Sequence, residues 1–181
     1  MKDEVIVITG ATGGIGSTIS KALFETKSKL VLVSRNQEKL KSLSSSLNDS
    51  LYFSGDVTDP IFVDSFVNQT VEKYGKIDGF IHCVGSIFLK PTHLTSLEEW
   101  NQTLLVNLTS AFIVTKAILK PMLSQKKGSV VLFSSVAAQT GMVNHPVISA
   151  AKAGIEGFIN IPDPSPKPAD LVNLGTIVIY Q

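Results

Sequence analysis

Residues 9–16 form a glycine-rich turn, Thr-Gly-Ala-Thr-Gly-Gly-Ile-Gly, that constrains the fold of this chain more than any other segment. The turn follows a β-branched run at residues 5–8 and precedes a segment with apolar residues at helical spacing. Glycines let the backbone approach a pyrophosphate, and the start of a helix supplies unpaired N–H groups. The spacing departs from the usual G-x-G-x-x-G, so a simple turn is the alternative. The strand before and the helix after it favour a dinucleotide site.

Short apolar runs alternate with amphipathic segments along the chain. The runs lie at residues 5–8, 30–33, 51–53, 77–84 and 130–133. Consecutive apolar residues are typical of strands buried on both faces. Asp59-Pro60 and the pair Ser96 and Glu99 mark two helix starts, as an N-cap followed by proline and as a capping box. The alternation predicts an α/β fold, a Rossmann-like doubly wound parallel sheet in a single domain.

Composition changes once along the 181 residues. Four of the eight prolines fall within residues 161–168, which excludes a helix or a central strand there. We therefore predict an NAD(P)-binding Rossmann-type domain over residues 1–160. A proline-rich segment follows over residues 161–181, in which residues 176–180 offer a final strand.

Charge and cysteine content exclude several classes of protein. Sixteen basic and fifteen acidic residues give a net charge of +1, with no basic stripe for nucleic acid or an anionic membrane. No apolar run approaches the ~18 residues of a membrane span, and the start does not resemble a signal peptide. Cys83 is the only cysteine, which excludes an intramolecular disulfide and a cysteine-based zinc site. We expect a cytoplasmic protein without a metal, with Cys83 as a buried packing residue.

Ser34 and Arg35 end the second predicted strand, about 20 residues after the glycine turn. A site for NAD usually places an acid there to hold the ribose 2′-hydroxyl, whereas a nearby arginine suits a 2′-phosphate. Ser34 removes the repulsive carboxylate and Arg35 supplies the cation, so NADP is favoured over NAD. The alternative is a solvated surface arginine.

Taken together, these motifs resemble those of the short-chain dehydrogenase/reductase family over residues 1 to about 157. The glycine turn matches the family's cofactor turn, and Asp56-Val57 resembles its adenine-ring contact. His82-Cys83-Val84-Gly85 occupies the place of the Asn-Asn-Ala-Gly motif, with only the glycine kept. The resemblance implies these cofactor-binding residues: Gly10, Thr12, Gly14, Ile15, Gly16, Ser34, Arg35, Asp56, Val57, Gly85 and Lys152.

The resemblance implies an NADP(H)-dependent oxidoreductase that acts on a carbonyl or a secondary alcohol. Ser135, Lys152 and Asn107 match the family's catalytic serine, lysine and asparagine. In the family, a tyrosine four residues before the lysine exchanges the proton, but Ile148 stands there and cannot do so. His145 or a water is the candidate replacement, because an imidazole titrates near neutral pH. A loop histidine without a role is the alternative.

The missing tyrosine leaves a second function open, a non-catalytic nucleotide-binding or interaction module. The family's helix at this point continues into another strand and a substrate-binding segment, so we expect a divergent, short member whose C-terminal part is truncated or atypical. Ser149 is expected to N-cap that helix, and His82 and His93 to be structural or exposed. The apolar helix at 100–124 suits either a homo-oligomer or packing on the sheet.

Overall fold

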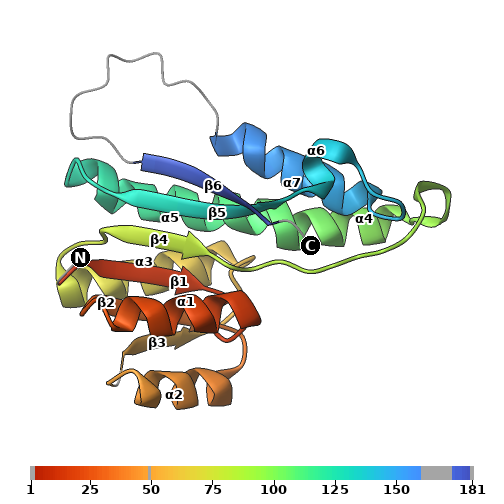
Figure 1. Ribbon diagram of the computed structural model, residues 1–181. Coiled ribbons are helices and arrows are strands. Elements are labelled where there is room, and N and C mark those ends of the chain that lie inside the picture. Colours follow the sequence, from red (N-terminus) through yellow and green to blue (C-terminus); the bar gives the residue numbers. More distant parts are fainter. Residues whose placement is uncertain (1–2, 49, 160–172, 180–181) are drawn as a thin grey trace.

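The structure is a computed structural model and describes residues 3–48, 50–159 and 173–179. Its core is one parallel sheet with the strand order β3-β2-β1-β4-β5-β6 (Figure 1). The strands are β1 (Val5–Thr9), β2 (Lys29–Ser34), β3 (Leu51–Ser54), β4 (Gly79–His82), β5 (Ser129–Ser135) and β6 (Asn173–Ile179). The predicted α/β fold with a Rossmann-like parallel sheet is confirmed.

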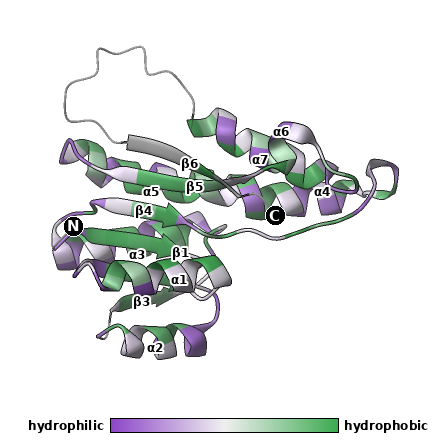
Figure 2. Ribbon diagram, in the orientation of Figure 1, coloured by the Kyte–Doolittle hydropathy of each residue, from purple (hydrophilic) through white to green (hydrophobic). Residues whose placement is uncertain are grey.

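Helices cover both faces of this sheet. They are α1 (Gly14–Phe24), α2 (Gln37–Ser46), α3 (Pro60–Tyr74), α4 (Leu97–Leu104), α5 (Ser110–Ser124), α6 (Ala137–Thr140) and α7 (Pro146–Ile159), with a 3-10 turn η1 (Thr92–Leu94) and a π-helical turn η2 (Leu105–Thr109). Val5 and Val7 pack into a core with α3, α5 and α7, whereas Ile6 and Ile8 pack with α1 and α2. Burial on both faces explains why β1 is apolar at consecutive positions, as its colour in Figure 2 shows.

The two predicted helix starts are confirmed. The Asp59 side chain accepts a hydrogen bond from the Ile61 amide at 2.9 Å, and Pro60 is the first residue of α3. At α4, the Ser96 hydroxyl accepts from the Glu99 amide, and the Glu99 carboxylate accepts from the Ser96 amide. These local bonds satisfy N–H groups that a helix leaves unpaired at its start.

The expected N-cap at Ser149 is wrong. Helix α7 begins at Pro146, and the Ser149 amide already donates to the His145 carbonyl at 2.8 Å inside the helix. Proline suits a first helical turn because its φ is fixed and it has no N–H to satisfy, so it starts the helix ahead of the serine. The Ser149 hydroxyl is buried without a hydrogen-bond partner among the described residues.

The final strand is present but differs in extent from the sequence expectation. β6 covers Asn173–Ile179 and pairs in parallel with β5, whereas residues 176–180 were the predicted strand. Most of the proline-rich segment lies outside the described residues.

Helices α4, η2 and α5 form one continuous helix, Leu97–Ser124, which is long and apolar enough by length and composition to cross a membrane. The sequence predicts no membrane span because it has no long uninterrupted apolar run, and polar residues interrupt the apolar residues of this helix. Val114, Ile118 and Met122 of this helix are fully buried in the core with α3 and the sheet. It is therefore a core helix of the domain, and its pairing with a second copy stays a prediction.

Candidate functional site

Two adjoining cavities lie at the carboxyl ends of the strands. The glycine-turn cavity, about 250 Å³, is bordered by the glycine turn and by the residues that follow β2 and β3. The lysine cavity, about 300 Å³, is bordered by the end of β5 and by α7. Cys83, Val84 and Gly85 line both, so the cavities form one continuous cleft. The cleft crosses the sheet between β1 and β4, where the strand order reverses and where doubly wound sheets bind ligands.

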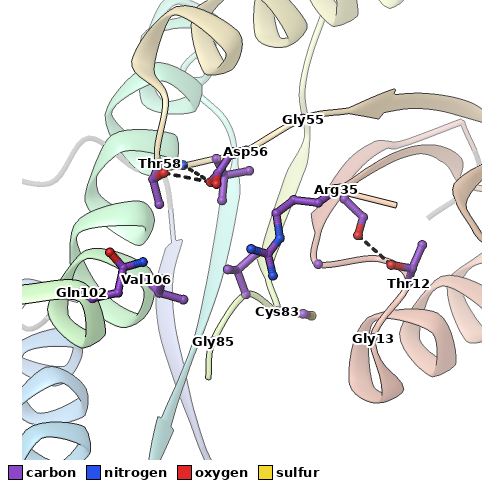
Figure 3. Close-up of a pocket in the computed structure, with 14 residues that line it drawn as sticks. Thr12, Gly13, Arg35, Gly55, Asp56, Thr58, Cys83, Gly85, Gln102 and Val106 are labelled. Atoms are coloured by element: carbon purple, nitrogen blue, oxygen red, sulfur yellow. Dashed lines mark hydrogen bonds between the residues drawn. The ribbon is translucent and has the colours of Figure 1, made fainter. Parts of the chain in front are cut away.

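The glycine-turn cavity gathers most of the predicted cofactor-binding residues (Figure 3). Those that line it are Gly10, Thr12, Ser34, Arg35, Asp56, Val57 and Gly85. Ile15 lines the lysine cavity instead. Gly14 and Gly16 line neither cavity and lie in the first turn of α1.

Two glycines are required by the path of the turn. Gly10 has φ +70°, and a Cβ there would lie 2.7 Å from the backbone carbonyl carbon of Cys83. A Cβ at Gly16 would overlap the carbonyl oxygen of Gly10. Gly13 precedes α1 and gives it no side-chain cap, so the first N–H groups of the helix stay available to a ligand. This helix end suits an anion such as a pyrophosphate.

A cation and an anion both line the glycine-turn cavity. Arg35, the sole arginine of the sequence, is exposed and extends into the cavity (Figure 3). The Asp56 carboxylate accepts from the amide and the hydroxyl of Thr58, at 2.9 and 2.8 Å. The Thr58 amide bond is the main cause that lowers the pKa of Asp56 below its ordinary value, supported by the Thr58 hydroxyl and the charge of Arg35 and opposed by burial. A hydrogen bond of 2.6 Å joins the hydroxyls of Ser34 and Thr12. It connects the end of β2 to the glycine turn.

Asn107 and Lys152 reach the lysine cavity from two different helices. Asn107 is buried in η2, where its amide nitrogen donates to the Thr103 carbonyl at 3.0 Å and to the Ser86 hydroxyl at 3.1 Å. Lys152 on α7 donates from Nζ to the Phe133 carbonyl at 2.9 Å, and burial lowers its pKa. A Cβ at Gly85 would lie 3.0 Å from Asn107 Oδ1 and 3.7 Å from Lys152 Nζ. Gly85 therefore lies beside both polar groups.

Ser135, His145 and Ile148 complete the lysine cavity. The Ser135 oxygen accepts from the Ala137 amide at 3.3 Å, and within the described residues its own proton has no acceptor, so it can be donated to a ligand. His145 Nδ1 lies 2.6 Å from the Val143 carbonyl, so Nδ1 carries the proton and Nε2 is the basic nitrogen of the neutral ring. Ile148 is buried at the position where the resemblance expects a tyrosine, and no tyrosine lines either cavity in the described residues.

His82 is structural, as predicted, and links three elements below the cleft. Nδ1 lies 2.8 Å from the Thr9 hydroxyl, and Nε2 lies 3.1 Å from the Ser110 hydroxyl. Because Ser110 donates to the Val106 carbonyl at 2.6 Å, its oxygen accepts from Nε2–H. Burial, with a smaller effect of the nearby Lys152 charge, lowers the pKa of His82 to about 3, so the ring is neutral. His93, also predicted to be structural or exposed, is exposed on η1.

The expectation that Cys83 is a buried packing residue needs correction. Cys83 packs against the core beneath α1 and α2, but it is only partly buried and lines both cavities. Burial raises the pKa of its thiol to about 12, so it is a neutral wall of the cleft. Cys83 follows β4 directly, at the carboxyl edge of the sheet where ligands bind. This position in the sequence is what could have predicted that it lines the cleft. Ser86, which holds Asn107, was also missed.

Comparisons with known proteins agree with this geometry. The sequence profile of the short chain dehydrogenase family matches residues 4–161. The chain is 30% identical over 162 residues to D-threitol dehydrogenase of Mycolicibacterium smegmatis, covering 87% of this chain and 62% of that protein. It is 35% identical over 166 residues to a short-chain dehydrogenase/reductase of Botryotinia fuckeliana, covering 86% and 63%.

Solved structures show the same likeness. NAD+-bound xylitol dehydrogenase superposes with a TM-score of 0.84 at 27% identity, over 87% of this chain and 63% of that one. Actinorhodin polyketide ketoreductase with NADPH gives a TM-score of 0.83 at 30% identity, over 88% and 64%. The chain thus spans slightly under two thirds of the length of these relatives. With this sheet, this cleft and a profile match over most of its length, the chain belongs to the short-chain dehydrogenase family.

Proposed function

We propose that the cleft binds NADP(H) and that the chain is an NADP(H)-dependent oxidoreductase acting on a carbonyl or a secondary alcohol. The observation that carries this proposal is the continuity of the cleft. It joins the glycine turn and Arg35 at one end to Ser135, Asn107 and Lys152 at the other. The relatives of known structure hold NAD+ in one case and NADPH in another, so the preference for NADP rests on Ser34 and Arg35 of this chain.

The residues of the cleft fit a dinucleotide. The tight glycine turn, which needs glycine at Gly10 and Gly16, and the uncapped start of α1 would hold the pyrophosphate. Arg35 would pair with the 2′-phosphate, and Asp56 and Val57 would contact the adenine end. Gly85 and Lys152 would lie at the nicotinamide ribose. When bound, the cofactor would supply or accept the hydride.

The protein's own part in the reaction is to hold the substrate oxygen and to move a proton. Ser135 would donate its free proton to the substrate oxygen, which stabilises charge that develops there. His145 Nε2 would accept the proton when an alcohol is oxidised and return it when a carbonyl is reduced, with a water as the other candidate. Loss of a well-placed general acid costs about 10²–10⁴ in rate, so slow turnover is expected.

Arg35→Ala is expected to weaken NADPH binding about tenfold to a hundredfold. Hydrogen bonds to a charged group contribute about 1.5–3 kcal/mol, and each 1.4 kcal/mol is tenfold in Kd. NADH lacks the 2′-phosphate, so its weaker affinity should not change. Titration of cofactor fluorescence measures both constants, and Lys41→Ala, an exposed charge on α2, is the matched control. Equal affinity of the unaltered chain for NADPH and NADH would reject the choice of cofactor.

His145→Ala is expected to abolish the residual carbonyl reduction and to leave NADPH affinity intact. The side chain lines the lysine cavity but not the glycine-turn cavity, so proton transfer is lost while the cofactor contacts remain. Initial rates of NADPH oxidation with a ketone measure the effect. The exposed His93→Ala on η1 is the control. Turnover that is unchanged in His145→Ala assigns the proton transfer to water.

Ile148 favours a second candidate, a nucleotide-binding or interaction module without catalysis, because its side chain cannot carry a proton. Such a module would bind NADPH and consume none. A screen of NADPH consumption against a panel of ketones and aldehydes separates the two functions, with Lys152→Ala as the inactive reference. Consumption that depends on Lys152 supports the enzyme.

A further inference from the structure

Lys152 has no acidic partner in the described residues. Its Nζ donates to the neutral Phe133 carbonyl, and no carboxylate lies within 4.0 Å of it in that part of the chain. Glu156, one turn further along α7, accepts from the Ser134 hydroxyl at 2.6 Å instead. An ammonium that is buried without a counter-ion is disfavoured relative to the neutral amine, which agrees with the lowered pKa of Lys152.

The lysine cavity combines the polar groups described above with apolar side chains that can hold a hydrocarbon chain. Its apolar side chains include Ile15, Ile87, Met142 and Ile148. Ile148 lies one helical turn before Lys152, so the amine has a hydrocarbon neighbour where a phenol would have supplied a polar one. A cavity of about 300 Å³ with this lining has room for a small ligand with an apolar chain.

We propose that Lys152 captures small apolar aldehydes as imines in the lysine cavity. In its neutral form, Nζ attacks the aldehyde carbon to form a C–N bond, and the C=O π electrons move to oxygen. Ser135 donates a hydrogen bond to that oxygen, because its own proton has no acceptor in the described residues. Proton transfer from nitrogen to oxygen and loss of water then give the imine. No oxidant, reductant or cofactor takes part, so this activity is independent of hydride transfer.

Reductive trapping of the full chain tests this capture. The chain is treated with hexanal and sodium cyanoborohydride near neutral pH without cofactor, and the adduct is located by peptide mass mapping. We expect a single predominant adduct on Lys152, while exposed lysines such as Lys41 carry little. Formaldehyde, which needs no apolar cavity, should label the exposed lysines as well.

Two variants sharpen the result. Lys152→Arg keeps a long basic side chain but removes the nucleophilic amine, so the predominant hexanal adduct should be lost. Lys41→Arg should keep it. Equal hexanal labelling of Lys41 and Lys152 in the unaltered chain overturns the proposal. This comparison does not depend on whether a variant folds. Persistence of the predominant adduct in Lys152→Arg overturns it too.

Discussion

Ile148→Tyr is expected to raise the rate of NADPH-dependent carbonyl reduction by about 10²–10⁴-fold, the usual contribution of a positioned general acid. Ile148 lines the lysine cavity together with Ser135. Lys152 follows it by four residues on α7, and residues at this spacing share a helix face. A phenol here would therefore reach the site of Ser135 and would exchange the proton that Ile148 cannot carry. Initial rates of NADPH oxidation across a panel of ketones measure the gain.

Ile148→Phe is the control for this gain, since it adds the ring without the hydroxyl. It should crowd the cavity as the tyrosine does and leave the rate at the low level of the unaltered chain. Circular dichroism of both variants should show the same helix content as the unaltered chain. If phenylalanine raised the rate as much as tyrosine, the effect would come from packing, and proton transfer would not be the missing step.

His82 is expected to lower the free energy of unfolding by about 2 kcal/mol as the pH falls from about 7.5 to about 5. The folded chain holds His82 with a pKa of about 3, against an ordinary value of about 6.5. Between these values the unfolded state binds a proton that the folded state does not. Acid therefore favours unfolding, by up to about 1.4 kcal/mol for each pH unit. Urea titrations at several pH values measure this slope.

His82→Asn isolates this contribution. Asparagine offers a donor and an acceptor for Ser110 and Thr9 but does not titrate. The resemblance to the family also places an asparagine at this position. We expect the variant to lose the part of the slope that belongs to the histidine, while shared acidic groups such as Asp56 and Asp78 keep theirs. The same pH dependence in both proteins would show that folding does not lower the pKa of His82.

The parts of the fold that rest on local chemistry could be predicted from the sequence. Consecutive β-branched residues in β1 predict a strand buried on both faces, and Asp59-Pro60 predicts the start of α3. Ser149 shows where local reasoning fails. A serine and a proline both suit a helix start. Which of them begins α7 depends on where the loop after α6 ends, and local sequence does not determine that.

The site divides in the same way. The lengths of α1 and β2 set the number of residues between the glycine turn and Arg35. The spacing therefore predicts that Arg35 lies in the glycine-turn cavity. The hydrogen bonds between Ser86 and Asn107 depend on the π-helical turn and on the loop after β4, which no local pattern encodes. The neutral partner of Lys152 likewise follows only from the packing of α7 on β5.

Isotope transfer tests the proposed oxidoreductase most directly. The chain is incubated with a panel of ketones and aldehydes and with NADPH that carries deuterium at its hydride-donating carbon, and the alcohols formed are examined by mass spectrometry. We predict a deuterium at the carbinol carbon, slowly with the unaltered chain and faster with Ile148→Tyr. Alcohols without deuterium, or no alcohol from either protein while both bind NADPH, would contradict hydride transfer and leave a nucleotide-binding module.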